Sequence, residues 1–128
     1  MKTIELRTEK RCAMVDITNH VEQYVKESAV KSGLVCVFVP HTTAGVSINE
    51  NADPDVTRDI MFALERMVPC SGFLHMEGNS DAHTKAHITG FSLTVIVENG
   101  RLQLGTWQGI YFCEFDGPRQ RRVYIKVL

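Results

Sequence analysis

Asn99-Gly100, which lies between two apolar segments, restricts the fold of this chain more than any other local feature. Both residues tolerate the positive φ that a two-residue type I′ turn requires. We therefore predict a β-hairpin, with one strand over residues 91–97 and its partner over 101–104. The fold must accordingly include at least one antiparallel pair of strands.

Several other segments have the composition of β-strands. Residues 34–39 are continuously apolar and rich in β-branched side chains, which predicts a central strand. Pro40 ends this strand, and extended structure is expected to resume over 46–50. Two further antiparallel pairs are predicted around turns, 3–7 with 12–16 around a charged turn and 110–115 with 121–127 around Asp116-Gly117-Pro118.

Three segments have the signals of helices, with apolar residues at helical spacing between an N-cap and a terminating glycine or proline. Asp53-Pro54 is the clearest start, because an N-cap is followed there by proline at the first helical position. We therefore expect an α+β fold, a mostly antiparallel sheet with about three helices. The helices are expected from Asp16 or Thr18 to Gly33, from Asp53-Pro54 to Met67, and from Ser80 or Asp81 to Gly90.

Length and charge limit the remaining possibilities. A chain of 128 residues has the size of one domain, so residues 1–128 are expected to form a single compact domain. The net charge of −1 gives no overall electrostatic footprint for nucleic acid or an anionic membrane. The start of the chain lacks the apolar core of a signal peptide, and no segment approaches the ~20 apolar residues of a membrane span. The expected location is the cytoplasm. The four cysteines are scattered and form no CxxC pair. Cys36 and Cys113 lie in apolar segments, so we expect small buried side chains there rather than a zinc or redox role.

Three short stretches concentrate the groups that carry chemistry. They are HTTAGVSINENADPD from His41, HMEGNSDAH from His75 and GTWQG from Gly105, and each follows or precedes an apolar segment. Loops that carry polar groups on a rigid frame are where binding and catalysis concentrate. The working hypothesis is one polar pocket assembled from all three.

The stretch from His75 to His83 contains two imidazoles and the carboxylates of Glu77 and Asp81 ahead of a short helix. Imidazole and carboxylate together can bind a divalent metal, and the helix N-terminus favours an anion. The alternative is a polar surface loop with a capped helix. His87 follows His83 by four residues, but HTKAH lacks the glutamate of a zinc-helix motif. The expected role of His87 is therefore packing, or a hydrogen bond that orients a ligand residue.

The other two stretches each allow two interpretations. The small residues of the HTTAG turn can bind phosphate oxygens through backbone N–H groups, or simply form a turn. Ser47 and Asn49 share one strand face, which is either functional or solvent-exposed. Trp107 is suited to forming a pocket wall or anchoring an interface. The arginines at 119, 121 and 122 suit phosphate but are more often a solvated face, and Arg119 is the best exception.

HTTAGVSINENADPDV, HxEGNSDAHxKA and GTWQGIYFCEFDGPR, with Met76 and Thr84 at the variable positions, closely resemble the YjbQ-like family over almost the whole chain. The resemblance implies a compact α+β subunit that forms a homotrimer, with the polar pocket near the subunit boundary. It also implies secondary thiamine-phosphate synthase activity, which joins a pyrimidine-methyl diphosphate to a thiazole phosphate and releases pyrophosphate. The motif positions carried over are His41, Thr42, Thr43, Asn49, Glu50, Asn79, Asp81, His83, Lys85, Thr106, Trp107, Gln108 and Arg119.

The sequence therefore leaves three candidate functions open. The first is the transferase, with catalytic His41, His75, His83 and Glu50. In it Lys85 and Arg119 bind phosphate, Glu50 and Asp81 hold Mg²⁺, and Trp107 stacks on a ring.

The second is a hydrolase of a small phosphorylated or acyl substrate. In it His75 and His83 hold Zn²⁺ or Mn²⁺, which suit histidine better than Mg²⁺ does, and Glu50 is the base. The third is a non-enzymatic trimer that binds a small phosphorylated ligand. No organic cofactor, nucleic acid or membrane partner is expected, and Ser47 joins the substrate-binding set.

Overall fold

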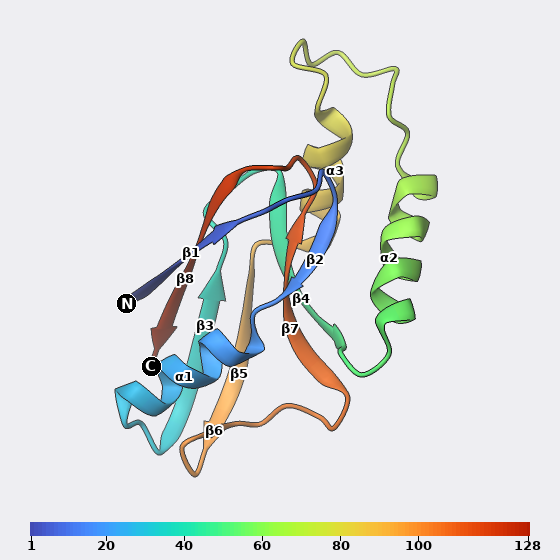
Figure 1. Ribbon diagram of the computed structural model, residues 1–128. Helices are drawn as coiled ribbons and strands as arrows, with labels where there is room; N and C mark the ends of the chain where they lie inside the picture. Colours follow the sequence, from blue (N-terminus) through green and yellow to red (C-terminus); the bar gives the residue numbers. More distant parts are fainter.

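The computed structural model describes all residues from 1 to 128. Each segment expected to be a strand or a helix is one, with ends that differ by a few residues (Figure 1). The strands are β1 (Lys2–Arg7), β2 (Ala13–Asp16), β3 (Ser32–Phe38), β4 (Ala44–Glu50), β5 (Ser92–Glu98), β6 (Arg101–Leu102), β7 (Gln108–Glu114) and β8 (Gln120–Val127), and the helices are α1 (Thr18–Ser28), α2 (Pro54–Met67) and α3 (Ser80–Thr89).

The strands form two antiparallel sheets. Sheet A has the order β1-β8-β3-β5-β6, and sheet B has the order β2-β7-β4. The prediction of a central strand at 34–39 is confirmed, because β3 pairs with both β8 and β5. The predicted hairpin is confirmed as well, since β5 pairs with β6 and the turn residues Asn99 and Gly100 have φ of 54° and 72°.

The two pairs predicted around turns are wrong. β1 pairs with β8 in sheet A, whereas β2 pairs with β7 in sheet B. Neither β1 with β2 nor β7 with β8 forms a hairpin, because the turn between them carries the chain from one sheet to the other. A strand, a turn and a strand in sequence do not specify the partner, which is decided by where the apolar faces can be buried.

Three connections, β1 to β2, β3 to β4 and β7 to β8, cross between the sheets at the same end of the molecule. Their backbones are joined by hydrogen bonds, so they form one rigid group of loops rather than independent turns. The bonds run from Thr8 N–H to the Arg119 carbonyl (2.9 Å), from Gly117 N–H to the Arg11 carbonyl (3.0 Å) and from Phe115 N–H to the Thr43 carbonyl (3.2 Å).

The main core lies between the two sheets and is closed by α1. It combines valines and isoleucines of β3, β5 and β8 with Val46 of β4 and with Ile110 and Phe112 of β7. The alternate residues of β7, among them Tyr111 and Cys113, pack on the other side of sheet B against Ala82 and Ala86 of α3. β7 is therefore buried on both faces, and α3 is fixed against the sheet end that carries the crossing loops.

The helix ends differ in part from the prediction. α2 begins as expected, since Asp53 Oδ1 accepts from the Asp55 N–H and Pro54 opens the helix. α1 does not extend to Gly33 but ends at Ala29, which takes the left-handed conformation with φ of 59°. The N-cap of α3 is Asn79 rather than Ser80 or Asp81. None of the helices is long and apolar enough to cross a membrane.

Candidate functional site

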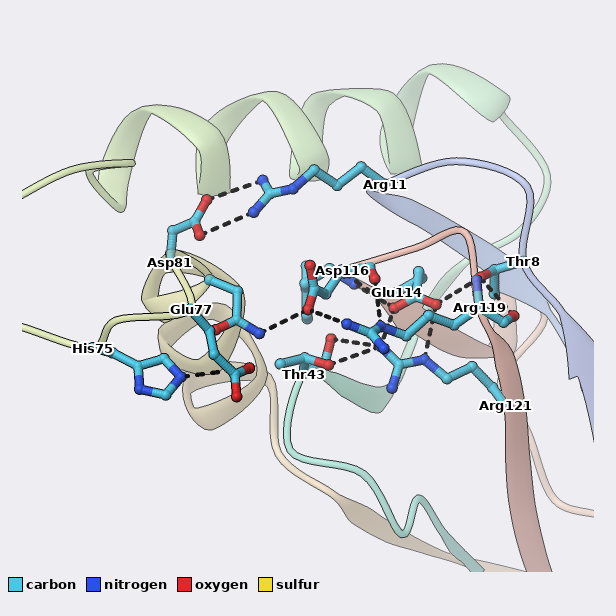
Figure 2. A network of polar contacts seen from close by, with 12 residues as sticks. Thr8, Arg11, Thr43, His75, Glu77, Asp81, Glu114, Asp116, Arg119 and Arg121 are labelled. Atoms are coloured by element: carbon cyan, nitrogen blue, oxygen red, sulfur yellow. Dashed lines mark hydrogen bonds and ion pairs between the residues drawn. The ribbon is translucent and has the colours of Figure 1, made fainter. Parts of the chain in front are cut away.

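A polar cavity of about 370 Å³ opens at the end of the molecule where the chain crosses between the sheets. It lies between the β3–β4 loop, the β7–β8 turn and the start of α3, whose polar side chains Figure 2 shows in part. Apart from a proline ring, every side chain that lines it is polar or charged. The lining residues are Pro40, His41, Thr42, Thr43, Glu77, Asn79, His83, Asp116, Arg119 and Arg121.

Arg121 is the most firmly held of these residues. Its side chain comes from the core-facing row of β8, where it continues the series of Val123 and Ile125, and it is only 4% exposed. The guanidinium donates through Nε to Glu114 Oε1 (2.9 Å) and through Nη2 to Glu114 and to Thr43 Oγ1 (2.8 Å) (Figure 2). Its remaining nitrogen, Nη1, makes no hydrogen bond within the protein, and Arg121 lines the cavity. The two N–H groups of Nη1 are therefore free for a ligand of the cavity.

Glu114, the partner of Arg121, is completely buried on β7. Burial opposes its charge, but hydrogen bonds from Arg121 and from Thr8 (2.6 Å) outweigh this effect, so the pKa of Glu114 lies below its ordinary value. The pair is thus ionised and joins the two sheets beside the cavity. A buried pair of this kind fixes the direction of the arginine, which is the preorganisation that recognition of an oxyanion needs.

Arg119 and Asp116 form a second, more open pair at the β7–β8 turn. Arg119 donates from Nε to the Asp116 carbonyl (2.8 Å) and from Nη2 to Asp116 Oδ2 (3.0 Å). The same carboxylate oxygen accepts from Nδ2 of Asn79 at 2.9 Å, which connects the turn to the start of α3. Arg119 is half-exposed, and its third nitrogen, Nη1, makes no hydrogen bond within the protein.

His41 is held as a neutral ring. Its Nε2 accepts the backbone N–H of Arg122 at 2.9 Å. Burial, followed by the positive charges of Arg121 and Arg122, lowers the pKa of His41. Because Nε2 accepts a hydrogen bond, the neutral ring carries its proton on Nδ1. His41 therefore offers a donor to a ligand and has no free lone pair with which to act as a base.

His83 on α3 is the imidazole of the cavity that makes no hydrogen bond within the protein. It also lines an adjoining cavity of about 390 Å³ with His75. The two rings meet edge to face with centroids 5.4 Å apart, and His75 Nε2 lies 3.8 Å from Glu77 Oε2. The HMEGNSDAH stretch therefore brings His75, Glu77 and His83 together, as the sequence suggested.

Asp81 lies in the same stretch and Lys85 lies two residues after its end, but neither side chain lines the cavity. Asp81 receives two hydrogen bonds of 3.0 Å from the guanidinium of Arg11, away from the other groups in Figure 2. These bonds hold the pKa of Asp81 below its ordinary value and raise that of Arg11. The buried Lys85 lies 3.7 Å from Glu65 of α2. Both side chains hold α3 against its neighbours.

The remaining candidates lie along β4 and at its opposite end. Glu50 is six residues from Ala44, roughly 20 Å along an extended strand, and Asn51 N–H donates there to the Trp107 carbonyl. The side chains of Thr106, Trp107 and Gln108 are exposed, with Trp107 62% exposed. Ser47 and Asn49 face α2 across a different cavity. Within one chain, therefore, the three polar stretches do not form one pocket.

The structure contains no group of three or more His, Cys, Asp or Glu side chains arranged to hold a metal ion. The pair of His75 and His83 proposed as metal ligands is close, but no third protein ligand completes it. Glu77 and Asp116 are the carboxylates that line the polar cavity. Mg²⁺ is commonly bound by one or two carboxylates together with substrate phosphates, so these two residues fit a metal that arrives with a phosphorylated ligand.

The sequence interpretation missed three residues that form the site: Arg121, Glu114 and Asp116. A run of arginines is typical of a solvated face, but the alternation of β8 puts Arg121 on the same face as Val123. The signal for Glu114 was a lone carboxylate within the apolar segment IYFCEF, because a buried charge requires a partner. The signal for Asp116 was its position in the turn before Arg119.

Comparison with known proteins gives one consistent result. The family described as UPF0047 protein YjbQ-like matches residues 2–128. UPF0047 protein YugU of Bacillus subtilis is 54% identical over 130 residues, which cover 100% of this chain and 98% of that protein. UPF0047 protein MJ1081 of Methanocaldococcus jannaschii is 50% identical over 125 residues, which cover 97% of this chain and 91% of that protein.

Solved structures agree with the sequence relatives. An uncharacterized conserved protein of the yjbq/upf0047 family from Clostridium acetobutylicum superposes with a TM-score of 0.98 at 54% identity, over 100% of both chains. A conserved hypothetical protein from Thermus thermophilus superposes with a TM-score of 0.92 at 41% identity, again over 100% of both chains. None of these names states an activity, so the function has to be argued from the chemistry of the site.

Proposed function

This chain belongs to the UPF0047, YjbQ-like family, and we propose that its polar cavity binds a small phosphorylated molecule and catalyses transfer of the group attached to the phosphate. The observation that carries this proposal is that Arg121 is nearly buried and lines the cavity, while its Nη1 makes no hydrogen bond within the protein. Burying a guanidinium is costly unless it is paired, and here the pairing leaves a fixed donor pair directed at a ligand.

The surrounding groups support the choice of phosphate as the ligand. Arg119 adds a second guanidinium, His41 adds an Nδ1–H donor, and Thr42 adds a hydroxyl. Charge-assisted hydrogen bonds of this kind are stronger than neutral ones, and arginine matches phosphate in geometry. The net charge of the whole chain is only −1, so attraction of an anion depends on this local cluster.

The reaction proposed first is of the thiamine-phosphate synthase type. In it the ring nitrogen of a thiazole phosphate forms a bond to the methylene carbon of a pyrimidine-methyl diphosphate, while the bond from that carbon to the diphosphate oxygen breaks. The bonding electrons leave with pyrophosphate. Arg119 and Arg121 would neutralise the charge that develops on the leaving group, and His83 would give it a proton. Glu77 and Asp116 would hold Mg²⁺, which supplies further neutralisation of the diphosphate when bound.

A second candidate function is favoured by the contact between His75 and His83. Two imidazoles with centroids 5.4 Å apart beside Glu77 are the beginning of a Zn²⁺ or Mn²⁺ site for a hydrolase of small phosphorylated or acyl substrates. In that reaction Glu77 takes the role of base that the sequence suggested for Glu50. Metal analysis of the purified protein tests this candidate, which requires close to one transition-metal ion per chain.

We also propose that the chain forms a homotrimer and that the exposed Trp107 anchors the interface. Trp107 lies between two glycines at the end of the molecule away from the cavity, and tryptophan is enriched in protein interfaces. Sedimentation analysis tests the proposal, because a monomeric wild-type protein would contradict it.

The experiment that tests the transferase is steady-state formation of thiamine phosphate by the purified protein with Mg²⁺. We expect kcat/KM near ~10⁴ M⁻¹s⁻¹, the lower range of ordinary enzymes, with a loss of at least about 100-fold in His83→Ala. His87→Ala is the matched control, since His87 is exposed on the same helix and does not line the cavity. If His83→Ala forms thiamine phosphate at the same rate as the wild type, the activity is due to a contaminant and the proposal is excluded. Phosphate binding without turnover would leave a non-enzymatic ligand-binding protein.

A further inference from the structure

A second, apolar cavity of about 280 Å³ adjoins the polar one. It is lined by Phe38, Val39, Pro40, His41, Thr42 and Phe91. Three of these residues, Pro40, His41 and Thr42, also line the polar cavity, so the two spaces meet along the same short segment. One side of this segment is charged and the other side is aromatic.

We propose that the apolar cavity is the subsite for a ring of the phosphorylated ligand, with Phe38 and Phe91 as the residues that select it. The inference rests on the proposed function of the polar cavity. It adds the place where the ring of an aromatic or heteroaromatic phosphate ester binds and the residues that select this ring. Small-molecule sites of roughly 300–1,000 Å³ usually combine apolar walls with a few polar anchors, and the two cavities together have this form.

The ring of Phe38 is held in a fixed orientation before any ligand binds. Its ring stacks on Tyr124 of the neighbouring strand, with centroids 6.4 Å apart and an angle of 26° between the planes. The backbone of β3 pairs Phe38 with Tyr124 in the register of sheet A, so the stack is part of the sheet. Phe38 nevertheless remains 43% exposed. An exposed phenyl ring that is held in one orientation provides a flat surface on which a second ring can pack.

Phe91 closes the other side of the apolar cavity. It packs partly against the cluster of Ala82 and Ala86 of α3, and its carbonyl accepts the N–H of Val39 at 2.7 Å. The segments that carry Phe38 and Phe91 are therefore tied together at the base of the cavity. Trp107, the ring surface suggested by the sequence, lies at the other end of β4 and cannot serve this cavity within the same chain.

His41 separates the two subsites and fixes the direction of the ligand. Its ring is held by the backbone N–H of Arg122, so its position does not depend on the ligand. A phosphate bound by Arg119 and Arg121 lies on the polar side of His41. The ring attached to that phosphate through a short linker then extends past Thr42 towards Phe38.

The test is an NMR titration of ¹⁵N-labelled protein with two probes, methyl phosphate and phenyl phosphate. In the wild type we expect phenyl phosphate to bind about tenfold more tightly, which corresponds to about 1.4 kcal/mol. Phe38→Ala should reduce this preference to less than about threefold and leave the affinity for methyl phosphate unchanged. Phe62→Ala is the control, because Phe62 is 61% exposed on α2 and lines neither cavity.

Phe91→Leu is the second variant, which fills the same space without a flat face and keeps the test decisive if Phe38→Ala does not fold. Equal affinity of the wild type for the two probes would overturn the inference. So would a phenyl preference that persists in both Phe38→Ala and Phe91→Leu. A different result would contradict the proposed function itself: no binding of methyl phosphate, or an affinity for methyl phosphate that Arg119→Ala does not change.

Discussion

The two ends of β4 carry similar numbers of polar residues and differ in what surrounds them. At its beginning, His41–Thr43 lie where three connections cross between the sheets and share backbone hydrogen bonds. At its end, Glu50 lies beside the exposed loop of Trp107. The first end gathers polar and charged groups around a cavity, whereas most polar side chains at the second end are exposed to solvent. Polar side chains converge only where several segments of the fold hold them in place.

The largest effect should follow from breaking the buried pair that supports the cavity end. Arg121→Met leaves the carboxylate of Glu114 buried without its partner, which should lower the free energy of unfolding by about 3–5 kcal/mol. Urea unfolding measures this change. Arg122→Met is the matched control, because Arg122 is the next residue of β8 and is exposed. If both variants unfold at similar urea concentrations, the pair does not support this end of the fold.

The next effect concerns catalysis at the two ends. Glu77→Gln should reduce thiamine phosphate formation, or hydrolysis if that is the reaction, by at least about tenfold, because Glu77 is a carboxylate that lines the cavity. Glu50→Gln should change it by less than about twofold, since Glu50 lies at the far end of the strand. Steady-state rates of the two variants decide whether Glu77 or Glu50 is the catalytic carboxylate. The reverse order would show that the catalytic carboxylate is Glu50, supplied by another chain.

A smaller effect is expected on acid stability. Arg11 lowers the pKa of Asp81 in the folded protein, so the stabilisation is complete above the ordinary pKa of aspartate and is lost as the pH falls through the lowered value. Asp81→Asn should therefore cost about 1 kcal/mol at pH 7 and flatten the fall in stability below pH 4. Asp55→Asn, which alters the exposed pair with Arg58, should have no measurable effect in the same urea titrations. Equal pH profiles for Asp81→Asn and the wild type would contradict this account.

The smallest effect on ligand binding is expected from Trp107→Ala. This variant removes the proposed interface anchor, so its mass in sedimentation should fall from that of the trimer towards that of one chain. Its affinity for methyl phosphate should stay within about threefold of the wild type, because the polar cavity lies at the other end of β4. A variant that remains trimeric but loses methyl phosphate binding would place Trp107 in the ligand site.

Local features of the sequence were sufficient for the elements of the fold. Asn99-Gly100 specified its hairpin because the turn geometry depends only on these two residues, and Asp53-Pro54 specified the start of α2 for the same reason. The three polar stretches also indicated His41 and His83 as cavity residues. In each case the signal and the structure that it describes lie within a few residues of one another.

The tertiary structure alone decided which strands pair, and with that the composition of the site. The turn before Arg119 was expected to close a hairpin, but it joins two sheets, and this crossing brings Arg121 of one sheet to Glu114 of the other. The same packing places Phe38 and Phe91 beside His41, although 52 residues lie between the two phenylalanines in sequence. Burial of apolar faces from distant segments drives these pairings, and no local pattern encodes which distant face a segment will meet.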